Sequence, residues 1–240
     1  AIAKTTPNTR QTLLFSATVD GKLDKIIQQL MKNPVRIDLS EQKMAPAKIK
    51  QELYVADNDH HKGRLLKHFM HDKNVFKAII FTATKISADK LARQLRDQNF
   101  SAAALHGDLK QNVRNRTLDQ LRQGKIQFLV ATDVAARGID VNDITHVFNY
   151  DLPKFSEDYV HRIGRTGRAF AEGDAVTLVS FEEERLIPAI EAFTNQKLPR
   201  KKLEGFAYRV PPRLHAYEAR PASKFRIRRV IPRGGPRFGR

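Results

Sequence analysis

The chain has 240 residues, of which 41% are hydrophobic and 29% are charged, which predicts a folded core and excludes a wholly disordered chain. No run approaches the roughly 20 apolar residues of a membrane span, and no signal-peptide pattern is present, so we expect a cytoplasmic protein without membrane contact. Cysteine is absent, which excludes disulfides and thiolate metal sites. Residues 197–240 carry 14 Lys and Arg against two Glu, which accounts for +12 of the net charge of +17 and favours polyanion binding.

The first fifty residues predict the edge of one lobe and a connection. "QTLLFSAT" (11–18) is typical of a strand, and the next segment predicts a helix with an apolar stripe of Leu23, Ile26, Ile27 and Leu30. A lone strand and helix cannot bury their own apolar faces. Residues 1–33 are therefore expected to be the end of a first lobe whose other strands lie outside this chain, and residues 34–50 to be an interlobe linker.

Residues 51–197 predict one α/β domain, with a mostly parallel, doubly wound sheet and helices on both faces. Apolar β-rich runs alternate with amphipathic helical stretches, which is typical of right-handed crossovers. Ser87 is expected to cap the first crossover helix. The adjacent His60 and His61 favour an exposed helix start over a metal site. The expected strands lie at 77–84, 101–107, 126–133, 144–151 and 173–181, before a last helix carrying Leu186, Ile187, Ile190 and Phe193.

The remaining residues, 198–240, form a basic tail rich in Arg, Pro and Gly. Its apolar residues show no helical period and its charge is too high for a core, so we expect most of it to be disordered. The first part, "LPRKKLEGFAYRVPP", is expected to pack onto the domain through Phe206 and Tyr208.

Polar clusters follow several of the expected strands, namely "TATK", "HGD", "TDVAARGID" and "YDLP". Ligands of parallel α/β sheets bind at the carboxyl ends of the strands. These clusters therefore predict that the functional edge of the sheet is the one where the strands end.

The stretch "HRIGRTGR" (161–168) concentrates cations between glycines. Arg162, Arg165 and Arg168 recur every third residue, so a helical turn would stack them on adjacent faces. A plain interpretation is a solvated basic helix paired with nearby acids such as Glu157 and Asp158. We favour a phosphate ligand, because arginine donates paired hydrogen bonds to phosphate oxygens and because the glycines would allow a close approach.

These blocks together carry a family resemblance. "HRIGRTGR", "SAT", "ATDVAARGID", "LHGDLKQNVR" and "FNYDLP" stand in the order and spacing that resemble the C-terminal half of a DEAD-box ATP-dependent RNA helicase, with the bacterial RhlE-like branch suspected. The resemblance implies two RecA-like lobes with RNA and ATP with Mg²⁺ bound between them. The phosphate-binding loop and the acidic Mg²⁺ site belong to the first lobe and are not in this sequence. The chain alone is therefore expected to be inactive as an ATPase.

The resemblance also implies roles on the nucleotide side. Arg165 and Arg168 match arginines that reach the γ-phosphate, and His161 matches a residue that links this block to "SAT". Asp140 and Gly138 match the nucleotide ribose contact. Arg162 is expected to brace the lobe. Ser16 and Thr18 match the block that couples hydrolysis to strand separation, although a local hydroxyl turn also explains them.

On the RNA side, the matching residues are those of blocks that grip the sugar-phosphate backbone, so binding independent of base sequence is implied. They are Thr84, Lys85, Gly107, Gln111, Arg114, Thr132 and Arg137. Each alone also fits a capping or surface role. The expected partners are RNA and the first lobe of the same protein, and a monomer is expected. Phe170 departs from the family pattern, which commonly has glycine there.

Two alternatives stay open. One is a DNA-directed superfamily-2 helicase, which shares the arginine logic but usually has glutamine where His161 stands. The other is a non-catalytic RNA-binding or annealing module, which the missing phosphate-binding loop favours. Paired arginines and Asp140 would have no purpose in that second case, so we favour a part of an enzyme.

Overall fold

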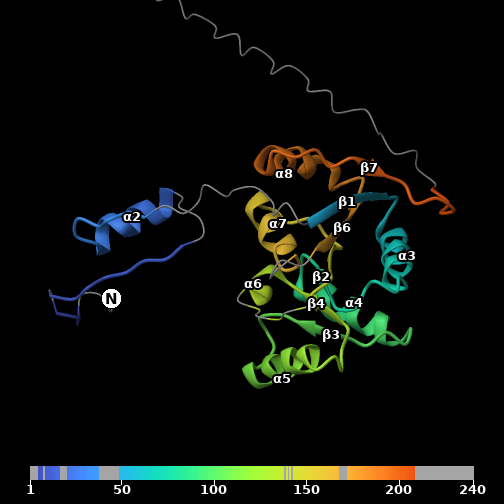
Figure 1. The fold of residues 1–240 in the computed structure, drawn as a ribbon, viewed down its shortest axis with the longest axis horizontal. Coiled ribbons are helices and arrows are strands. Elements are labelled where there is room, and N and C mark those ends of the chain that lie inside the picture. The colour runs from blue at the N-terminus through green and yellow to red at the C-terminus, as the bar shows by residue number, and fades with distance from the viewer. Residues whose placement is uncertain are drawn as a thin grey trace, which may run out of the picture.

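A single seven-stranded sheet organises the chain (Figure 1). The computed structural model describes residues 5–7, 9–16, 21–37, 49–137, 139, 141, 143–167 and 172–208. All strand pairs are parallel and the order is β3-β4-β2-β5-β6-β1-β7, which confirms the predicted RecA-like, doubly wound fold. The strands are β1 (Ile49–Ala56), β2 (Ala78–Phe81), β3 (Ala102–Leu105), β4 (Phe128–Ala131), β5 (His146–Asn149), β6 (Gly173–Ser180) and β7 (Arg200–Lys201).

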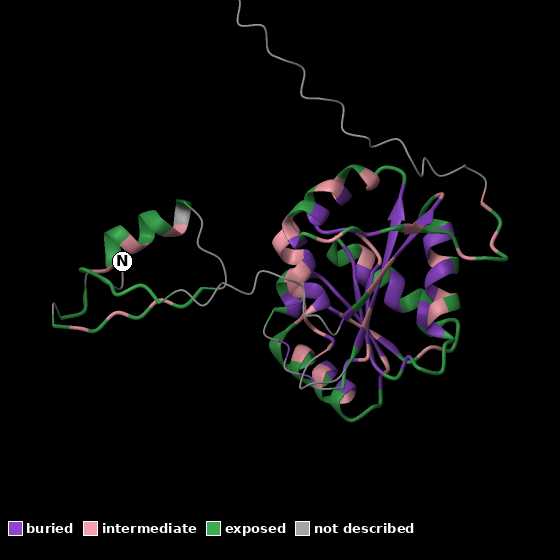
Figure 2. Ribbon diagram, turned by 45° about the horizontal axis from the view of Figure 1, so that its top comes forward, coloured by how far each residue is buried: buried purple, intermediate pink, exposed green. Residues whose placement is uncertain are grey.

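Helices cover both faces of the sheet, so its strands are buried on each side (Figure 2). In β2, Ile80 packs with the apolar side chains of α3 and α4, whereas Ile79 packs with those of α5 and α6 on the other face. Near β1 and β6, α7 and α8 cover that second face. The helices are α3 (Asp59–Met70), α4 (Lys85–Arg96), α5 (Gln111–Arg122), α6 (Asp133–Ala136), α7 (Ser156–Ile163) and α8 (Ile187–Thr194), which follows the short 3₁₀ helix η2 (Glu184–Leu186).

The start of α4 differs from the sequence prediction. Thr84, and not Ser87, is the N-cap: its backbone is extended and its hydroxyl oxygen accepts a hydrogen bond from the Ser87 N–H at 3.0 Å. Ser87 lies three residues inside the helix, where its hydroxyl accepts from the Thr84 hydroxyl at 2.8 Å. The chain turns into the helix directly after β2, so the earlier hydroxyl residue occupies the capping position.

In the N-terminal part, the predicted helix is present as α2 (Gly21–Leu30), but the predicted strand is not formed. Residues 11–16 belong to no strand, and Leu13 and Phe15 are 68% and 89% exposed. A strand needs a neighbour for its backbone hydrogen bonds, and none pairs with this segment among the described residues. Residues 17, 18 and 38–48 lie outside the described residues, and β1 begins at Ile49, two residues before the expected start of the domain at residue 51.

The C-terminal arm, residues 198–208, packs onto the domain as predicted. Its short strand β7 pairs with β1, and Phe206 and Tyr208 contact the ring of His61 on α3. The prediction of an exposed helix start at the two histidines was wrong for His61, which is only 4% exposed because this arm covers it. Burial lowers the pKa of His61, although Asp57 opposes the shift. Residues 209–240 lie outside the described residues.

Candidate functional site

Polar side chains meet at the edge where the parallel strands end. Thr82–Lys85 follow β2, His106–Asp108 follow β3, Thr132 and Asp133 follow β4, and Tyr150 and Asp151 follow β5. Because all these strands run in the same direction, their carboxyl ends share one edge. The structure confirms the predicted placement of the "TATK", "HGD" and "YDLP" clusters and of the described residues of "TDVAARGID", which are 132–137 and 139.

Arg162, in the last turn of α7, is buried and neutralised. Its guanidinium makes a two-pronged ion pair with Asp133, from Nε to Oδ1 at 2.6 Å and from Nη2 to Oδ2 at 2.8 Å. Nη1 donates to the Asp151 carbonyl oxygen at 2.6 Å, and the group lies over the Phe81 ring. With 2% of the residue exposed, Arg162 joins the ends of β4 and β5 to α7, which confirms its predicted bracing role.

Arg165 lies in the turn that follows α7 and is only partly buried. The helix ends at Ile163 and Gly164 is its C-cap, where a Cβ atom would lie 3.2 Å from the Val160 carbonyl oxygen. The Arg165 guanidinium donates from Nε to the His161 carbonyl at 3.2 Å and from Nη1 to the Ile139 carbonyl at 3.3 Å. Both bonds go to backbone carbonyl oxygens, and they orient the guanidinium at the strand-end edge.

Arg162 and Arg165 therefore do not lie on one helical turn. Arg162 belongs to α7, whereas Arg165 follows the helix end, and Gly167 adopts a left-handed φ of 65° that prevents further helix. Arg168 lies outside the described residues, as do Thr18, Gly138, Asp140 and Phe170. Ser16 is described and exposed, at the end of the irregular segment 11–16.

A small cleft between α6 and α7 collects the described residues of the predicted nucleotide side. We call it the α6–α7 cleft; its lining is Phe81, Asp133, Ala136, Arg137, Asp158, His161, Arg162 and Arg165. Asp158 is shared: its Oδ1 lies 3.0 Å from Arg137 Nη2 and 3.9 Å from Nδ1 of His161, which is 41% exposed. The cleft therefore combines one neutralised arginine, one carboxylate-paired arginine and one arginine held by carbonyls.

The other predicted RNA-side residues lie at the ends of β2, β3 and β4. Lys85 forms an ion pair with Asp108, and the open position at Gly107 lies beside the Lys85 side chain, with 3.9 Å between a built Cβ and Cε. Thr132 is the N-cap of α6 but makes no side-chain capping bond. The sheet edge thus presents an ion pair and a glycine turn side by side.

Gln111 and Arg114 lie in the first turn of α5, whose N-terminus follows the β3 cluster. Gln111 Nε2 donates to Asn115 Oδ1 at 2.9 Å, and Arg114 Nη1 lies 3.4 Å from Gln111 Oε1. These contacts fix the side chains along one face of α5. A helix N-terminus attracts anions through its unpaired N–H groups.

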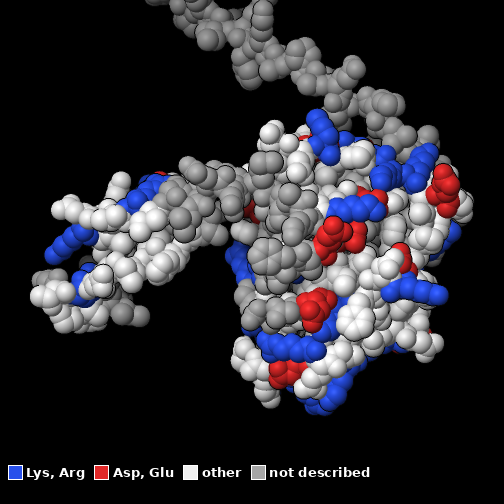
Figure 3. Space-filling view, viewed as in Figure 1, with Lys and Arg blue, Asp and Glu red and all other residues white. Residues whose placement is uncertain are grey.

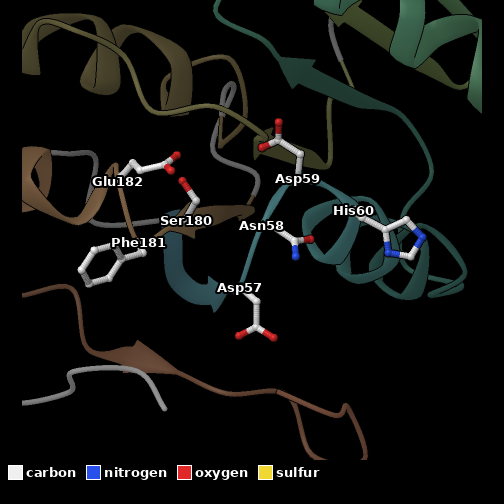
Figure 4. A pocket seen from close by; sticks show the side chains of 7 residues that line it. All are labelled: Asp57, Asn58, Asp59, His60, Ser180, Phe181 and Glu182. Carbon is white, nitrogen blue, oxygen red and sulfur yellow. The ribbon is translucent and has the colours of Figure 1, made fainter. Parts of the chain in front are cut away.

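A larger hollow of about 390 Å³ lies at the ends of β1 and β6 and contains none of the predicted site residues (Figure 4). It is lined by Asp57, Asn58, Asp59, His60, Ser180, Phe181 and Glu182. Three carboxylates in this lining repel a phosphate, whereas the α6–α7 cleft offers guanidinium groups. We therefore assign the candidate site to the smaller cleft.

Two carboxylates of this region escaped the sequence prediction. Asp133 neutralises Arg162, and Asp158 joins Arg137 to His161. Asp133 could have been predicted as a site residue, because it closely follows a buried strand at the edge where ligands bind. Asp158 was considered only as a surface partner of a basic helix. In the part of the chain that the structure describes, no group of three or more His, Cys, Asp or Glu could hold a metal ion, and no helix is long and apolar enough to span a membrane.

Comparisons with known proteins agree with the fold. Residues 61–170 match the helicase conserved C-terminal domain. The chain is 40% identical over 212 residues to the ATP-dependent RNA helicase SrmB of Haemophilus influenzae, covering 88% of this chain and 48% of that protein. It is 37% identical over 234 residues to RhlB of a Shewanella species, covering 96% and 53%. The chain thus spans about half the length of these relatives.

Solved structures give the same family. E. coli SrmB, in complex with the ribonuclease regulator RraA, is 35% identical with a TM-score of 0.66, over 68% of this chain and 96% of that one. S. cerevisiae Dbp5 bound to RNA and ADP BeF3 is 30% identical with a TM-score of 0.74, over 84% of this chain and 54% of that one. From the fold, the edge clusters and these matches, the chain belongs to the DEAD-box ATP-dependent RNA helicase family and contains its C-terminal RecA-like lobe.

Proposed function

We propose that this chain is part of an ATP-dependent RNA helicase in which its lobe supplies arginine fingers to a nucleotide held by a first lobe. The supporting observation is Arg165, whose guanidinium is oriented at the strand-end edge by the His161 and Ile139 carbonyls. A guanidinium placed beside a transferring phosphoryl group can stabilise the charge that builds on it. Arg168 is proposed as the second finger.

The rest of the nucleotide site is divided between this lobe and the first. Gly138 and Asp140 are proposed to contact the ribose, and His161, oriented beside Asp158, to link the arginine block to Ser16 and Thr18. Mg²⁺, bound by the first lobe, would neutralise phosphate oxygens. Without that lobe, the chain is expected to bind no Mg²⁺–ATP productively and to show no ATPase activity.

RNA is proposed to lie along the carboxyl ends of β2, β3 and β4. Lys85 and Arg137 would exchange their present carboxylate partners, Asp108 and Asp158, for phosphates. Gly107, Gln111, Arg114, Thr84 and Thr132 complete the groove. Such contacts reach only the sugar-phosphate backbone, so we propose binding that does not depend on base sequence.

The binding of ATP and the binding of RNA are expected to be coupled, because each ligand would contact both lobes. ATP and RNA would each favour the closed arrangement, so each strengthens the binding of the other. Closure would bend one RNA strand and open a few base pairs of a duplex, and phosphate release would let the lobes separate. We propose that the protein does this as a cytoplasmic monomer.

The test uses the complete protein beside the 240-residue chain. Purified full-length protein should hydrolyse ATP, with a rate that rises on adding single-stranded RNA and much less on adding DNA of equal length. The 240-residue chain should bind RNA without hydrolysing ATP. Equal stimulation by DNA would support a DNA-directed motor, and RNA binding without hydrolysis by the full-length protein would support an annealing module.

A further inference from the structure

A buried lysine on α3 stands apart from the predicted site and has no role in it so far. Lys62 belongs to the apolar stripe of α3, with Leu65, Leu66 and Met70, and only 1% of its side chain is exposed. An ammonium group buried this deeply must be paired, since an isolated charge is costly away from water. The groups that pair with Lys62 therefore show which segments of the chain α3 holds in place.

Lys62 points at the ends of β5 and β6. Its Nζ donates to the Tyr150 carbonyl oxygen at 2.9 Å, forms an ion pair with Glu183, and lies 3.7 Å from Asp151 Oδ1. Only 19% of each carboxylate side chain is exposed. We call Lys62, Asp151 and Glu183 the Lys62 cluster.

The Glu183 carboxylate accepts hydrogen bonds from the segment after β5 and from the end of β6. Its Oε1 accepts from the Leu152 N–H at 3.0 Å, and its Oε2 accepts from the Ser180 N–H and hydroxyl, each at 3.0 Å. Burial alone would raise the pKa of Glu183, but Lys62 and these N–H groups outweigh it and hold the pKa below its ordinary value of 4.5. Glu183 is therefore an ionised clamp between the segment after β5 and the turn after β6.

Asp151 extends the cluster to the loop after β2. Its Oδ2 accepts from the Ala83 N–H at 2.8 Å, and Ala83 directly precedes Thr84 and Lys85. The backbone of the same residue also reaches the arginine region, because the Asp151 carbonyl accepts from Arg162. One residue thus joins the loop on the RNA side to the brace beneath the α6–α7 cleft.

We propose that the Lys62 cluster is a positioning element that holds the loop of residues 82–85 in the conformation that contacts RNA. The path runs from Lys62 through Asp151 to the Ala83 N–H, with Glu183 fixing Lys62 and the neighbouring Leu152. None of the three side chains needs to touch RNA. This inference rests on the proposed RNA groove, since Thr84 and Lys85 are the residues it positions.

The experiment measures the order of the 82–85 loop and the affinity for RNA separately. In the 240-residue chain, amide hydrogen exchange at Ala83 is measured by NMR, and affinity for a labelled oligouridine is measured at several salt concentrations, because the basic tail adds a salt-sensitive term. The variants are Asp151→Ala, Asp151→Asn, which keeps an acceptor oxygen, and Lys62→Met. Lys67→Met, on the same helix outside the cluster, is the matched control, and thermal melts verify that each variant is folded.

Asp151→Ala should speed exchange at Ala83 about tenfold or more, as expected for a lost bond to a charged acceptor, and weaken oligouridine binding several-fold at each salt concentration. Asp151→Asn should recover most of both effects, and Lys62→Met, if folded, should resemble Asp151→Ala. Lys67→Met should change neither.

Unchanged exchange at Ala83 in Asp151→Ala would overturn the proposal, and so would faster exchange with unaltered RNA affinity. The proposed function is tested separately by the double variant Thr84→Ala, Lys85→Ala. If that variant binds oligouridine like wild type, the RNA groove itself is wrong, whatever the Asp151 variants show.

Discussion

The last turn of α7 and the turn after it hold two arginines in different surroundings. Arg162 is buried, faces both oxygens of Asp133 and is neutralised inside its own lobe. Arg165, three residues later, is partly buried and is held by carbonyl oxygens. The comparison teaches that a repeated residue type does not imply a repeated role: Arg162 is enclosed as a brace, whereas Arg165 is only partly buried at the strand-end edge.

The basic character of the chain divides in a similar way. Over the face shown in Figure 3, Lys and Arg of the described residues lie among Asp and Glu. Most of the excess charge instead belongs to residues 197–240, which carry +12 of the net +17. We therefore expect the folded lobe to supply geometry to RNA binding and the tail to supply most of its salt dependence.

The largest expected effect is on catalysis. Arg165→Ala in the full-length protein should lower RNA-stimulated ATP turnover about 10³-fold or more, the range of arginine fingers in nucleotidases. Its free energy of unfolding should fall by about 1–2 kcal/mol, because the side chain is only partly buried and its bonds to the His161 and Ile139 carbonyls are lost. Steady-state turnover and urea unfolding measure the two, with Arg93→Ala on the exposed face of α4 as control. Turnover within tenfold of wild type would remove Arg165 from the finger role.

Arg162→Met should lower the stability of the fold much more than Arg165→Ala does. It leaves the half-buried Asp133 and the Asp151 carbonyl oxygen without their guanidinium partner, so the free energy of unfolding of the 240-residue chain should fall by about 3 kcal/mol or more. Urea unfolding followed by circular dichroism measures it. A loss below about 1 kcal/mol would mean that Arg162 is not a brace, and the contrast with Arg165 would disappear.

Glu183→Gln should give a smaller and pH-dependent loss, up to about 3 kcal/mol at neutral pH. The folded-state pKa of Glu183 is below 4.5, so its stabilising effect is present above that pH and is lost as the pH falls through the folded pKa. Unfolding free energies measured from pH 7 to pH 3 should converge below about 4.5, and a constant gap would contradict the ionised clamp.

The smallest effect concerns the start of α4. Thr84→Ala should cost about 1 kcal/mol, because it removes the capping hydroxyl, and Ser87→Ala should cost less. Thermal unfolding of the two variants side by side measures the difference. If Ser87→Ala is the more damaging, the sequence-based assignment of the cap was the better one.

Local patterns predicted most of the fold. The apolar runs at Ala78–Phe81 and Phe128–Ala131 became buried strands of the sheet. The segment 11–16 could not be assigned from its own sequence, because a strand depends on a neighbour and its apolar side chains remain exposed.

The sequence predicted which residues belong to the candidate site, but it did not predict which partner each of them has. The sequence marks "HRIGRTGR", yet only the fold brings Asp133 against Arg162 from 29 residues away. His61 is buried by residues 206–208, far along the chain, and no local pattern shows this cover. Lys62 did carry a signal, since its spacing to Leu65, Leu66 and Met70 puts a lysine on an apolar stripe.

The most direct test asks whether Arg165 recognises the phosphoryl position of the nucleotide. Affinities of full-length wild type and Arg165→Ala are measured, with RNA present, for ADP and for ADP with beryllium fluoride, which stands in for the γ-phosphate. We predict that ADP binds both proteins alike, within about twofold, and that the variant binds the beryllium fluoride complex at least tenfold more weakly, a difference of about 1.4 kcal/mol or more. Equal affinities for the beryllium fluoride complex, or an equal loss for both ligands, would contradict the account.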